Sequence, residues 1–287
     1  MKFPNPEEKG ALDLAIATAD RRNLTLILAS DPDADRFAAA ERLPSGGWHI
    51  FTGNQLGVLF AAHIFGKRKS EGENIETLAM LTSTVSTQML QAMASAEGFH
   101  YEETLTGFKW LGNQALVLEE RGYDAAYAFE EAIGYMFSPV VHDKDGIAAA
   151  SIFATMARQL AQEGFTVYQK LDQLFRKYGY FETANSYFVS PDPTSIKIAF
   201  AGIRGLGSPH PKKLGNRHIT RWRDLTEGFD SATEGGVPVL PVSKDSEMIT
   251  CELEDNIRFT VRASGTEPKI KSKTRYHHIH ISAASHT

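Results

Sequence analysis

Hydrophobic positions in the first part of the chain follow a helical period and then a strand period. Leu12, Ile16 and Ala19 recur at helical spacing behind Asn5 and Pro6, which suit the start of a helix. The elements predicted here are a helix over 6–22, a strand over 24–29, a hairpin over 37–51 and a helix over 54–65. A helix followed by an apolar strand is typical of a doubly wound α/β sheet.

A second α/β pattern begins near residue 73, after a polar stretch over 66–74 that we interpret as a boundary. Its predicted elements are strands over 77–81, 100–105 and 125–129 and helices over 86–97, 113–121, 147–163 and 167–178. After residue 190 a helix over 194–205 precedes strands over 218–225, 247–253 and 257–261. These patterns predict an α/β protein with two mixed-sheet α/β domains and a smaller α+β domain. The predicted domains are 1–72, 73–190 and 191–276, with a tail over 277–287.

The composition narrows the class of protein. Of 287 residues, 42% are hydrophobic and 23% are charged, which is the balance of a globular chain rather than a disordered one. The net charge is −5 and no basic stripe is present, so we expect no nucleic-acid partner. A single cysteine, Cys251, excludes an internal disulfide and favours a reducing compartment. Because no apolar run approaches the ~20 residues that span a bilayer and residues 1–10 are too polar for a signal peptide, we expect a cytoplasmic protein without a membrane partner.

Three carboxylates at alternating positions, Asp31, Asp33 and Asp35, follow the predicted strand over 24–29, which we expect to be buried. Converging carboxylate oxygens suit Mg²⁺, and without a cation they would repel one another. A calcium EF-hand is excluded, because loop positions six and twelve hold Arg36 and Arg42 instead of Gly and Glu. A haloacid-dehalogenase-type phosphatase would have Thr or Val where Asp35 stands. An exposed acidic turn stays open as the alternative.

A second cluster with evident chemistry contains Arg262, Ser264, Gly265 and Thr266. A guanidinium group binds phosphate through paired hydrogen bonds, hydroxyls add donors, and glycine lets backbone amides close around an anion. The segment therefore predicts a phosphate site. The same residue types also form ordinary capped turns, and that interpretation stays open for the segment taken alone.

Two loops between these clusters carry further candidates. Lys109 lies in a glycine-bracketed connection, where it contacts a phosphate or sugar oxygen or is simply an exposed lysine. Glu130 and Glu131 follow a predicted strand, where a carboxylate accepts hydrogen bonds from sugar hydroxyls or belongs to a solvated acidic pair. The segment 142–146 is interpreted as a turn that caps the next helix, and we expect no direct chemistry from His142.

Together these segments resemble a known family. The segments in question are ASDPDADR at 29–36, GFKWLGN at 107–113, FEEAIGY at 129–135, DKDGI at 143–147 and RASGTEPKIK at 262–271. Their order and separations resemble the α-D-phosphohexomutase superfamily over roughly residues 3–271. Within it, the chain is similar to the phosphoglucomutase branch that includes phosphopentomutase and glucose-1,6-bisphosphate synthase. In that family four domains surround one cleft, so the resemblance implies that the first domain of this chain is incomplete.

The resemblance implies a role for each candidate. The three aspartates are then the metal ligands of a Mg²⁺ site, and Arg36 is the catalytic residue next to the transferred phosphoryl group. The implied substrate-binding residues are Lys109, Glu130 and Glu131 for the sugar and Arg262, Ser264, Gly265 and Thr266 for the non-reacting phosphate.

The implied activity is that of an isomerase of carbohydrate metabolism. Such a mutase is a Mg²⁺-dependent intramolecular phosphotransferase that interconverts sugar 1-phosphates with 5- or 6-phosphates through a bisphosphate. The implied partners are a pentose or hexose phosphate and a sugar bisphosphate, bound by a monomer. The remote phosphate site suits this chemistry, because it holds a substrate that must bind in two orientations.

Three departures from the family pattern limit these expectations. The Ser-His-Asn-Pro nucleophile segment is absent, Ala132 stands where many members have serine, and the chain departs from the family after Lys271. We therefore expect a chain truncated at its N-terminus and its C-terminus, with little or no mutase turnover alone. His277, His278 and His280 are interpreted as part of a frayed tail. A non-catalytic sugar-phosphate or metal-binding fragment stays open, as does a Mg²⁺ phosphatase of another fold, although such a phosphatase has no evident need for the other three loops.

Overall fold

The computed structural model describes residues 5–190, 192–264 and 269–278. The chain divides into two compact units, Met1–Gly179 and Tyr180–Thr287, and the predicted mixed α/β class is confirmed. The second unit starts earlier than the predicted residue 191, because a strand that begins at Tyr180 joins its sheet. The predicted division of the first unit at residue 72 stays a prediction.

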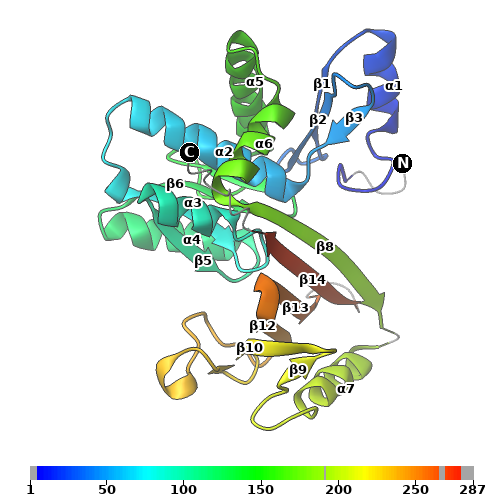
Figure 1. Cartoon of the computed structure of the whole chain (residues 1–287), viewed down its shortest axis with the longest axis vertical. Coiled ribbons are helices and arrows are strands. Elements are labelled where there is room, and N and C mark those ends of the chain that lie inside the picture. The colour runs from blue at the N-terminus through cyan, green and yellow to red at the C-terminus, as the bar shows by residue number, and fades with distance from the viewer. Residues whose placement is uncertain (1–4, 191, 265–268, 279–287) are drawn as a thin grey trace, which may run out of the picture. The chain divides into compact units, whose positions relative to one another are not determined.

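The first part of unit 1 is a helix packed on a three-stranded antiparallel sheet (Figure 1). Its elements are α1 (Asp13–Arg21), β1 (Leu26–Ser30), β2 (Phe37–Arg42) and β3 (Trp48–Ile50), and its small core holds Leu12, Ala19, Ile27 and Ala40. β1 and β2 pair from Leu26↔Glu41 to Ser30↔Phe37. The segment 31–36 is therefore the connection between two neighbouring antiparallel strands.

Two expectations for this part are wrong. The helix begins at Asp13 rather than at residue 6, because Gly10 has a φ of +83°, outside the right-handed helical region. β1 is not a buried strand of a wound sheet: Leu28 is 43% exposed, since β2 is the one strand that β1 pairs with in the described part of the chain. The hairpin predicted over 37–51 is confirmed by the pairing of β2 with β3.

The second part of unit 1 is a four-stranded sheet with a helix against each face. Its strands are β4 (Leu78–Ser83), β5 (His100–Thr104), β6 (Asp124–Glu130) and β7 (Gly134–Phe137), in the order β5-β4-β6-β7, and its helices and short turn are α2 (Gly53–Ser70), η1 (Ile75–Thr77), α3 (Met89–Glu97), α4 (Phe108–Glu120), α5 (Gly146–Gln162) and α6 (Val167–Tyr178). β4 pairs with β5 and β6 in parallel, and β7 is antiparallel to β6. Leu111 and Ala115 of α4 pack on one face of the sheet, while Phe60 of α2 contacts Tyr127 on the other.

Three boundaries in this part differ from the sequence prediction. α2 continues to Ser70, so residues 66–70 are helical and not a linker. α4 begins at Phe108 rather than at residue 113, which places Lys109 in a first helical turn. β7 was not predicted, because a four-residue strand is too short to show a period, although all four residues are buried.

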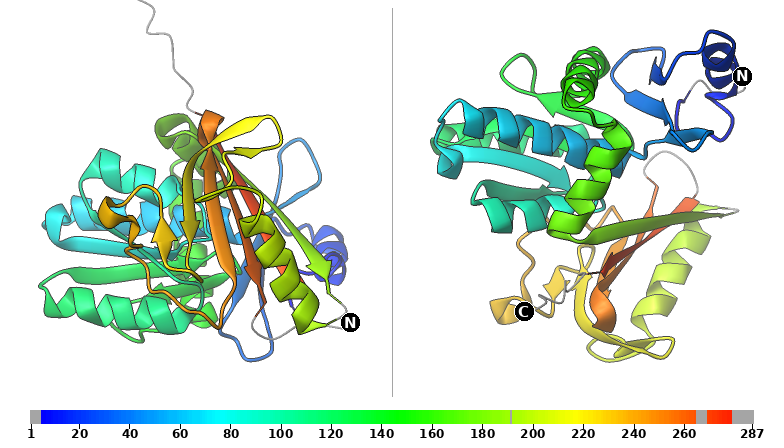
Figure 2. Two further views of the ribbon diagram at one scale, coloured as in Figure 1. Left: turned by 90° about the horizontal axis from the view of Figure 1, so that it is seen from below. Right: turned by 45° about the horizontal axis from the view of Figure 1, so that its top comes forward.

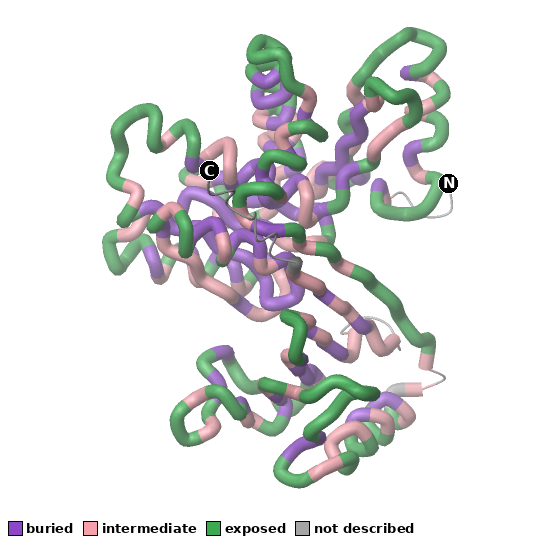
Figure 3. The backbone as a smooth tube through the Cα atoms, viewed as in Figure 1, coloured by how far each residue is buried: buried purple, intermediate pink, exposed green. Residues whose placement is uncertain are grey.

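A cluster of aromatic rings joins the two parts of unit 1. Phe37 on β2 lies 6.2 Å from Phe60 on α2 and 5.6 Å from Phe153 on α5, measured between ring centroids. Phe60 also contacts Tyr135 on β7 at 5.1 Å. Figure 3 shows the buried residues running through these strands and helices. The start of β2, directly after the segment 31–36, is therefore held by packing against β7 and α5.

Unit 2 is an antiparallel sheet with one helix along it (Figure 2). Its elements are β8 (Tyr180–Val189), α7 (Pro193–Arg204), β9 (Lys213–Leu214), β10 (Arg217–Asp224), β11 (Phe229–Asp230), η2 (Glu234–Gly236), β12 (Met248–Leu253), η3 (Glu254–Asn256), β13 (Ile257–Ala263) and β14 (Lys269–His278), and its strand order is β11-β10-β12-β13-β14-β8 with β9 on β10. Ile196 and Phe200 of α7 pack with Trp222, Ile249 and Val261 of the sheet. This core matches the predicted smaller α+β region.

The long strands β8 and β14 were not predicted. They pair over ten residues, from Lys269↔Val189 to His278↔Tyr180. β14 escaped the sequence prediction because Lys269, Lys271 and Lys273 alternate along it, so it lacks the apolar run of a buried strand. His277, assigned to the tail, pairs with Phe181 in this ladder, and the rest of the predicted tail beyond residue 278 lies outside the described residues. No helix among the described residues is long and apolar enough to cross a membrane.

Candidate active site

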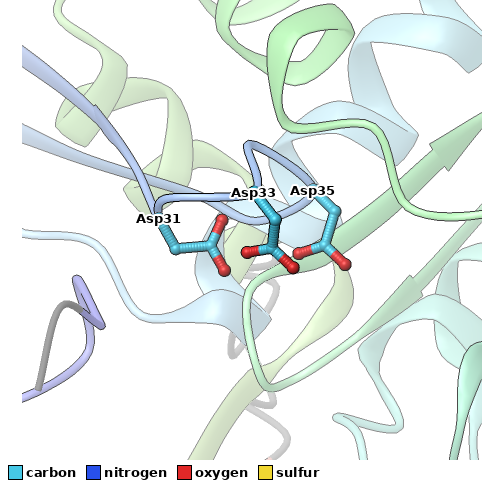
Figure 4. Close-up of side chains that lie close together, drawn as sticks. All are labelled: Asp31, Asp33 and Asp35. Carbon is cyan, nitrogen blue, oxygen red and sulfur yellow. The ribbon is translucent and has the colours of Figure 1, made fainter.

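The three aspartates predicted to bind metal lie together on the connection between β1 and β2 (Figure 4). One carboxylate oxygen from each of Asp31, Asp33 and Asp35 falls within 4.8 Å of the others. Asp31 is buried, Asp33 is exposed and Asp35 is half-buried. Ala34, with a φ of +59°, lets the backbone turn so that three alternating side chains reach one place.

Arg36 holds Asp31 in its ionised form. Its backbone N–H donates to Asp31 Oδ1 at 3.0 Å and its Nε donates to Oδ2 at 2.6 Å. Burial by itself would raise the pKa of Asp31, but the hydrogen bonds and positive charge of Arg36 outweigh it and keep this pKa below its usual value. The carboxylate is therefore ready to face a cation at neutral pH.

One oxygen of Asp35 has no hydrogen bond to the described residues, although the Nε of Arg36 lies 3.8 Å from it as an ion-pair partner. Its Oδ2 lies 3.0 Å from the Nζ of Lys144, whereas its Oδ1 is buried and has no hydrogen-bond partner in the described part of the chain. A buried oxygen without a partner is costly, by roughly 1–3 kcal/mol. Since carboxylate oxygens are the preferred ligands of hard divalent cations, the residues present fit such an ion.

Lys144 is a site residue that the sequence interpretation missed. The segment around it was predicted to cap a helix, and this is confirmed: Asp145 Oδ1 accepts from the N–H groups of Ile147 and Ala148. The same turn, however, brings Lys144 to Asp35, and although burial opposes this, the hydrogen bond and charge of Asp35 raise the pKa of Lys144 above its usual value. In the sequence, a lysine between two acids looks like an ordinary surface residue. The only signal for Lys144 was its position within the segment DKDGI.

Gly146 makes this contact between the turn and the aspartate loop possible. Its N–H donates to Ala34 O at 3.0 Å, and a Cβ at this position would lie 2.5 Å from Arg36 O and 2.7 Å from Ala34 O. Such distances exclude any side chain unless the backbone moves. The glycine therefore fixes the aspartate loop against the start of α5.

The loop between β6 and β7, which carries both glutamates, is bonded to the aspartate loop. Phe37 N–H donates to Ile133 O at 3.0 Å, and Arg36 and Gly134 form an antiparallel bridge. Glu130 Oε1 accepts from the N–H of Gly107 at 2.5 Å. Segments far apart in sequence, 31–37 and 130–134, are thus joined through their backbones.

Glu131 is tied to the end of β4. Its Oε2 lies 3.2 Å from the hydroxyls of both Ser83 and Ser86. These serines were not among the predicted residues. The signal that marks them is the hydroxyl-rich run 82–87 at the end of a strand.

Lys109 lies in the first turn of α4, two residues after Gly107, and its Nζ stands 5.6 Å from the ring centroid of Trp110. Because Gly107 donates to Glu130, the start of this helix is linked to the glutamate loop. The structure therefore brings the backbone positions of Lys109 and Glu130 into one neighbourhood of unit 1, beside the aspartate loop.

The predicted phosphate residues belong to unit 2. Arg262 stands near the end of β13, opposite Lys271 of β14, and Ser264 N–H donates to Lys269 O at 2.8 Å. Both Arg262 and Ser264 are half-buried. Gly265 and Thr266 lie outside the described residues. Two cations thus face each other across the strands at the base of this loop.

The chain matches two domain models of one family. Residues 52–178 match phosphoglucomutase/phosphomannomutase α/β/α domain III, and residues 1–46 match domain II of the same family. A probable phosphoribomutase from Schizosaccharomyces pombe is 46% identical over 274 residues. In Homo sapiens, phosphopentomutase is 46% and glucose 1,6-bisphosphate synthase 44% identical, each over 277 residues.

These matches cover 94% of this chain and 46%, 45% and 44% of the three relatives, so the chain spans about half the length of the curated relatives it matches. Among solved structures, the phosphoglucomutase pp63/parafusin from Paramecium, in its open form, has a TM-score of 0.66 at 16% identity, over 99% of this chain and 47% of that one. A phosphoglucomutase/phosphomannomutase family protein from Burkholderia thailandensis has a TM-score of 0.61 at 16% identity, over 95% and 47%. At such identity these two structures show the fold.

The fold and the site define a mixed α/β protein whose acidic loop connects two strands of its first sheet and is hydrogen-bonded to its second sheet. With the matched domains and relatives, the resemblance found in the sequence is confirmed: the chain belongs to the phosphoglucomutase/phosphomannomutase family of the α-D-phosphohexomutase superfamily.

Proposed function

We propose that this chain carries the metal site and sugar site of a phosphosugar mutase, an isomerase that interconverts sugar 1-phosphates and 5- or 6-phosphates through a sugar bisphosphate. The observation that carries the proposal is the backbone bonding between the aspartate loop and the loop that bears Glu130, through Phe37 and Ile133. It joins a cation site to a carboxylate suited to sugar hydroxyls. The names of the relatives, phosphopentomutase and glucose 1,6-bisphosphate synthase, support the substrate class.

The metal of this site is proposed to be Mg²⁺, held by Asp31, Asp33 and Asp35. When bound, it supplies charge neutralisation to a phosphoryl group in transfer. The guanidinium group of Arg36 lies beside Asp31, where it would orient the phosphoryl group and balance its negative charge. Lys144, next to Asp35, holds a further positive charge at the edge of the site.

The sugar phosphate, a pentose or a hexose, is proposed to contact Lys109 and Glu130 of unit 1. The sugar contact predicted for Glu131 stays a prediction, and the Oε2 of this residue lies against Ser83 and Ser86. In unit 2, Arg262 and Ser264 are proposed to bind the non-reacting phosphate together with Gly265 and Thr266. The cross-strand pairing of Arg262 with Lys271 supports this, because two facing cations favour a bound anion.

The 287 residues contain no Ser-His-Asn-Pro segment. We therefore expect the isolated chain to bind metal and sugar phosphate as a monomer but to turn over at near-background rates. This expectation keeps a non-catalytic binding function for the isolated chain as the second candidate.

Calorimetry of the 287-residue chain with ribose 1-phosphate or glucose 1-phosphate in Mg²⁺ tests the proposal. We expect measurable binding that Arg262→Ala weakens by at least about tenfold, because a charge-assisted phosphate contact contributes about 1.5–3 kcal/mol. Arg217→Ala, on an exposed surface position of the same sheet, is the matched control. Equal affinities for the wild-type and Arg262→Ala chains would contradict the phosphate role.

A mutase assay with a bisphosphate activator should give background rates. Robust turnover would contradict the expectation that the isolated chain is inactive.

A further inference from the structure

Six consecutive residues at the end of β4 are almost completely buried although five of them carry hydroxyls. They are Thr82, Ser83, Thr84, Val85, Ser86 and Thr87, and each has at most 4% of its surface exposed. Burying a hydroxyl is unfavourable unless it finds a hydrogen-bond partner. The hydrogen-bond partners of these hydroxyls therefore indicate the structural role of the segment.

Two of the hydroxyls converge on one residue. Ser83 Oγ and Ser86 Oγ lie 2.8 Å apart, and each lies 3.2 Å from Glu131 Oε2. The backbone N–H of Glu131 also donates to Ser86 Oγ, at 3.0 Å. Two hydroxyl protons and one amide proton thus serve a closed network that binds both the side chain and the backbone of Glu131.

This network lies where the connections of two neighbouring strands leave the sheet in opposite directions. β4 is flanked by β5 on one side and by β6 on the other, and the chain leaves β4 towards β5 but leaves β6 towards β7. Open α/β sheets bind ligands beyond the carboxyl ends of strands at such a point of divergence. Ser83 ends β4, Glu130 ends β6 and Glu131 follows it, so the network lies at this edge of the sheet.

The loop after β6 is held from both sides. Glu131 is bonded to the end of β4, and Glu130 accepts from the N–H of Gly107 at the start of α4. Gly53 of α2 lies directly against the same loop, because a Cβ there would stand 2.0 Å from Glu131 O. Asn54 of α2 accepts from the N–H of Thr87 at 2.9 Å, which ties the hydroxyl segment to the same helix.

We propose that Ser83 and Ser86 are positioning residues, which clamp Glu131 and thereby fix the loop 130–134 for substrate binding. Glu131 then acts through the loop that presents Glu130, rather than as a sugar contact. The proposal rests on the proposed function for its consequence in binding. The clamp itself is a property of the unliganded chain and is measurable without any ligand.

The first test is amide hydrogen exchange of the full 287-residue chain carrying Ser83→Ala and Ser86→Ala. The informative amides are Phe37 and Gly107, which bond to Ile133 O and Glu130 Oε1 and touch neither serine. We expect both to exchange about fivefold faster or more, the equivalent of one lost hydrogen bond. Thr82→Val is the matched control, since its buried hydroxyl bonds to Phe129 O and not to Glu131.

Glu131→Gln changes the other side of the clamp. Because Glu131 is half-buried, this variant is expected to fold, and the amides of Phe37 and Gly107 should exchange faster in it as well. Exchange at Phe37 and Gly107 that matches the Thr82→Val control in both variants would overturn the proposal.

The second test separates positioning from general stability. In Mg²⁺ buffer, the double serine variant should bind ribose 1-phosphate about fivefold more weakly, while its affinity for Mg²⁺ alone stays unchanged. Faster exchange with an unchanged affinity for ribose 1-phosphate would reduce the clamp to a structural role and overturn the positioning claim. If the wild-type chain binds no sugar phosphate, the proposed function fails, and the exchange comparison decides the clamp by itself.

Discussion

The two acidic loops of unit 1 use their carboxylates in opposite ways. On the loop 31–36 three carboxylate oxygens lie within 4.8 Å of one another, and Asp35 Oδ1 is buried without a hydrogen-bond partner in the described part of the chain. On the loop 130–134 the adjacent carboxylates of Glu130 and Glu131 accept hydrogen bonds from Gly107 and from two serines. Residue type is therefore a poor guide to role. The partners show that one loop leaves a buried carboxylate oxygen without a hydrogen bond to any described residue, whereas both carboxylates of the other are hydrogen-bonded to the protein.

Removing a carboxylate from each neighbourhood gives the largest contrast. Asp33→Asn should weaken Mg²⁺ binding by about 100-fold, because it removes a proposed direct ligand, and even the groups that support metal ligands contribute 10- to 100-fold. Asp143→Asn, an exposed acid beside Lys144 but outside the triad, should leave Mg²⁺ affinity within about twofold. Titration calorimetry with Mg²⁺ alone measures both. Equal losses in the two variants would mean that the triad is no specific site.

The contact between the aspartate loop and α5 is expected to have the next largest effect. Gly146→Ala should destabilise the chain by about 1–3 kcal/mol, because its Cβ would overlap the carbonyls of Ala34 and Arg36. Gly66→Ala, in α2 with open space around it, should instead stabilise by about 0.5–1 kcal/mol. Chemical denaturation measures both. A Gly146→Ala chain as stable as the wild type would show that the two loops are not held as described.

Lys144 gives the smallest and most selective effect. Its ammonium group stands 3.0 Å from Asp35 Oδ2, where it would compete with the proposed metal ion for that oxygen. Lys144→Met should therefore bind Mg²⁺ a few-fold more tightly, consistent with about 1 kcal/mol for a partly exposed ion pair. Lys67→Met, which removes an exposed lysine from an ion pair on α2, is the control and should not change Mg²⁺ affinity. Weaker Mg²⁺ binding in Lys144→Met would contradict the competition.

The main helices and the central strands could be predicted from sequence because each has its own hydrophobic period. α6 over Val167–Tyr178 agrees with the prediction residue by residue, since a capping box at Thr166 and an amphipathic face define it locally. β14 could not be predicted in the same way, because its alternating lysines make sense only beside β13 and β8. The start of α1 was misplaced because a single left-handed glycine, Gly10, interrupts an otherwise helical pattern.

The candidate site residues also divide into those with a local sequence signal and those without one. Asp31, Asp33 and Asp35 were recognisable because three like charges at alternate positions need a common reason, and their spacing is local. Lys144, Ser83 and Ser86 were not recognisable, because their partners are 109, 48 and 45 residues away in sequence. The roles carried over from the family for Lys109 and Arg262 remain predictions.

The sequence by itself determined the family of this chain, its class of fold and the residue types that gather at its acidic loop, because these depend on local periods and short motifs. Tertiary structure alone decided that Asp35 Oδ1 is left without a hydrogen bond in the described part of the chain, whereas the carboxylates of Glu130 and Glu131 are bonded into the protein. That distinction depends on backbone amides and hydroxyls brought from other strands, such as Gly107 and Ser86. Hydrogen bonds between segments so far apart arise only when the sheet assembles.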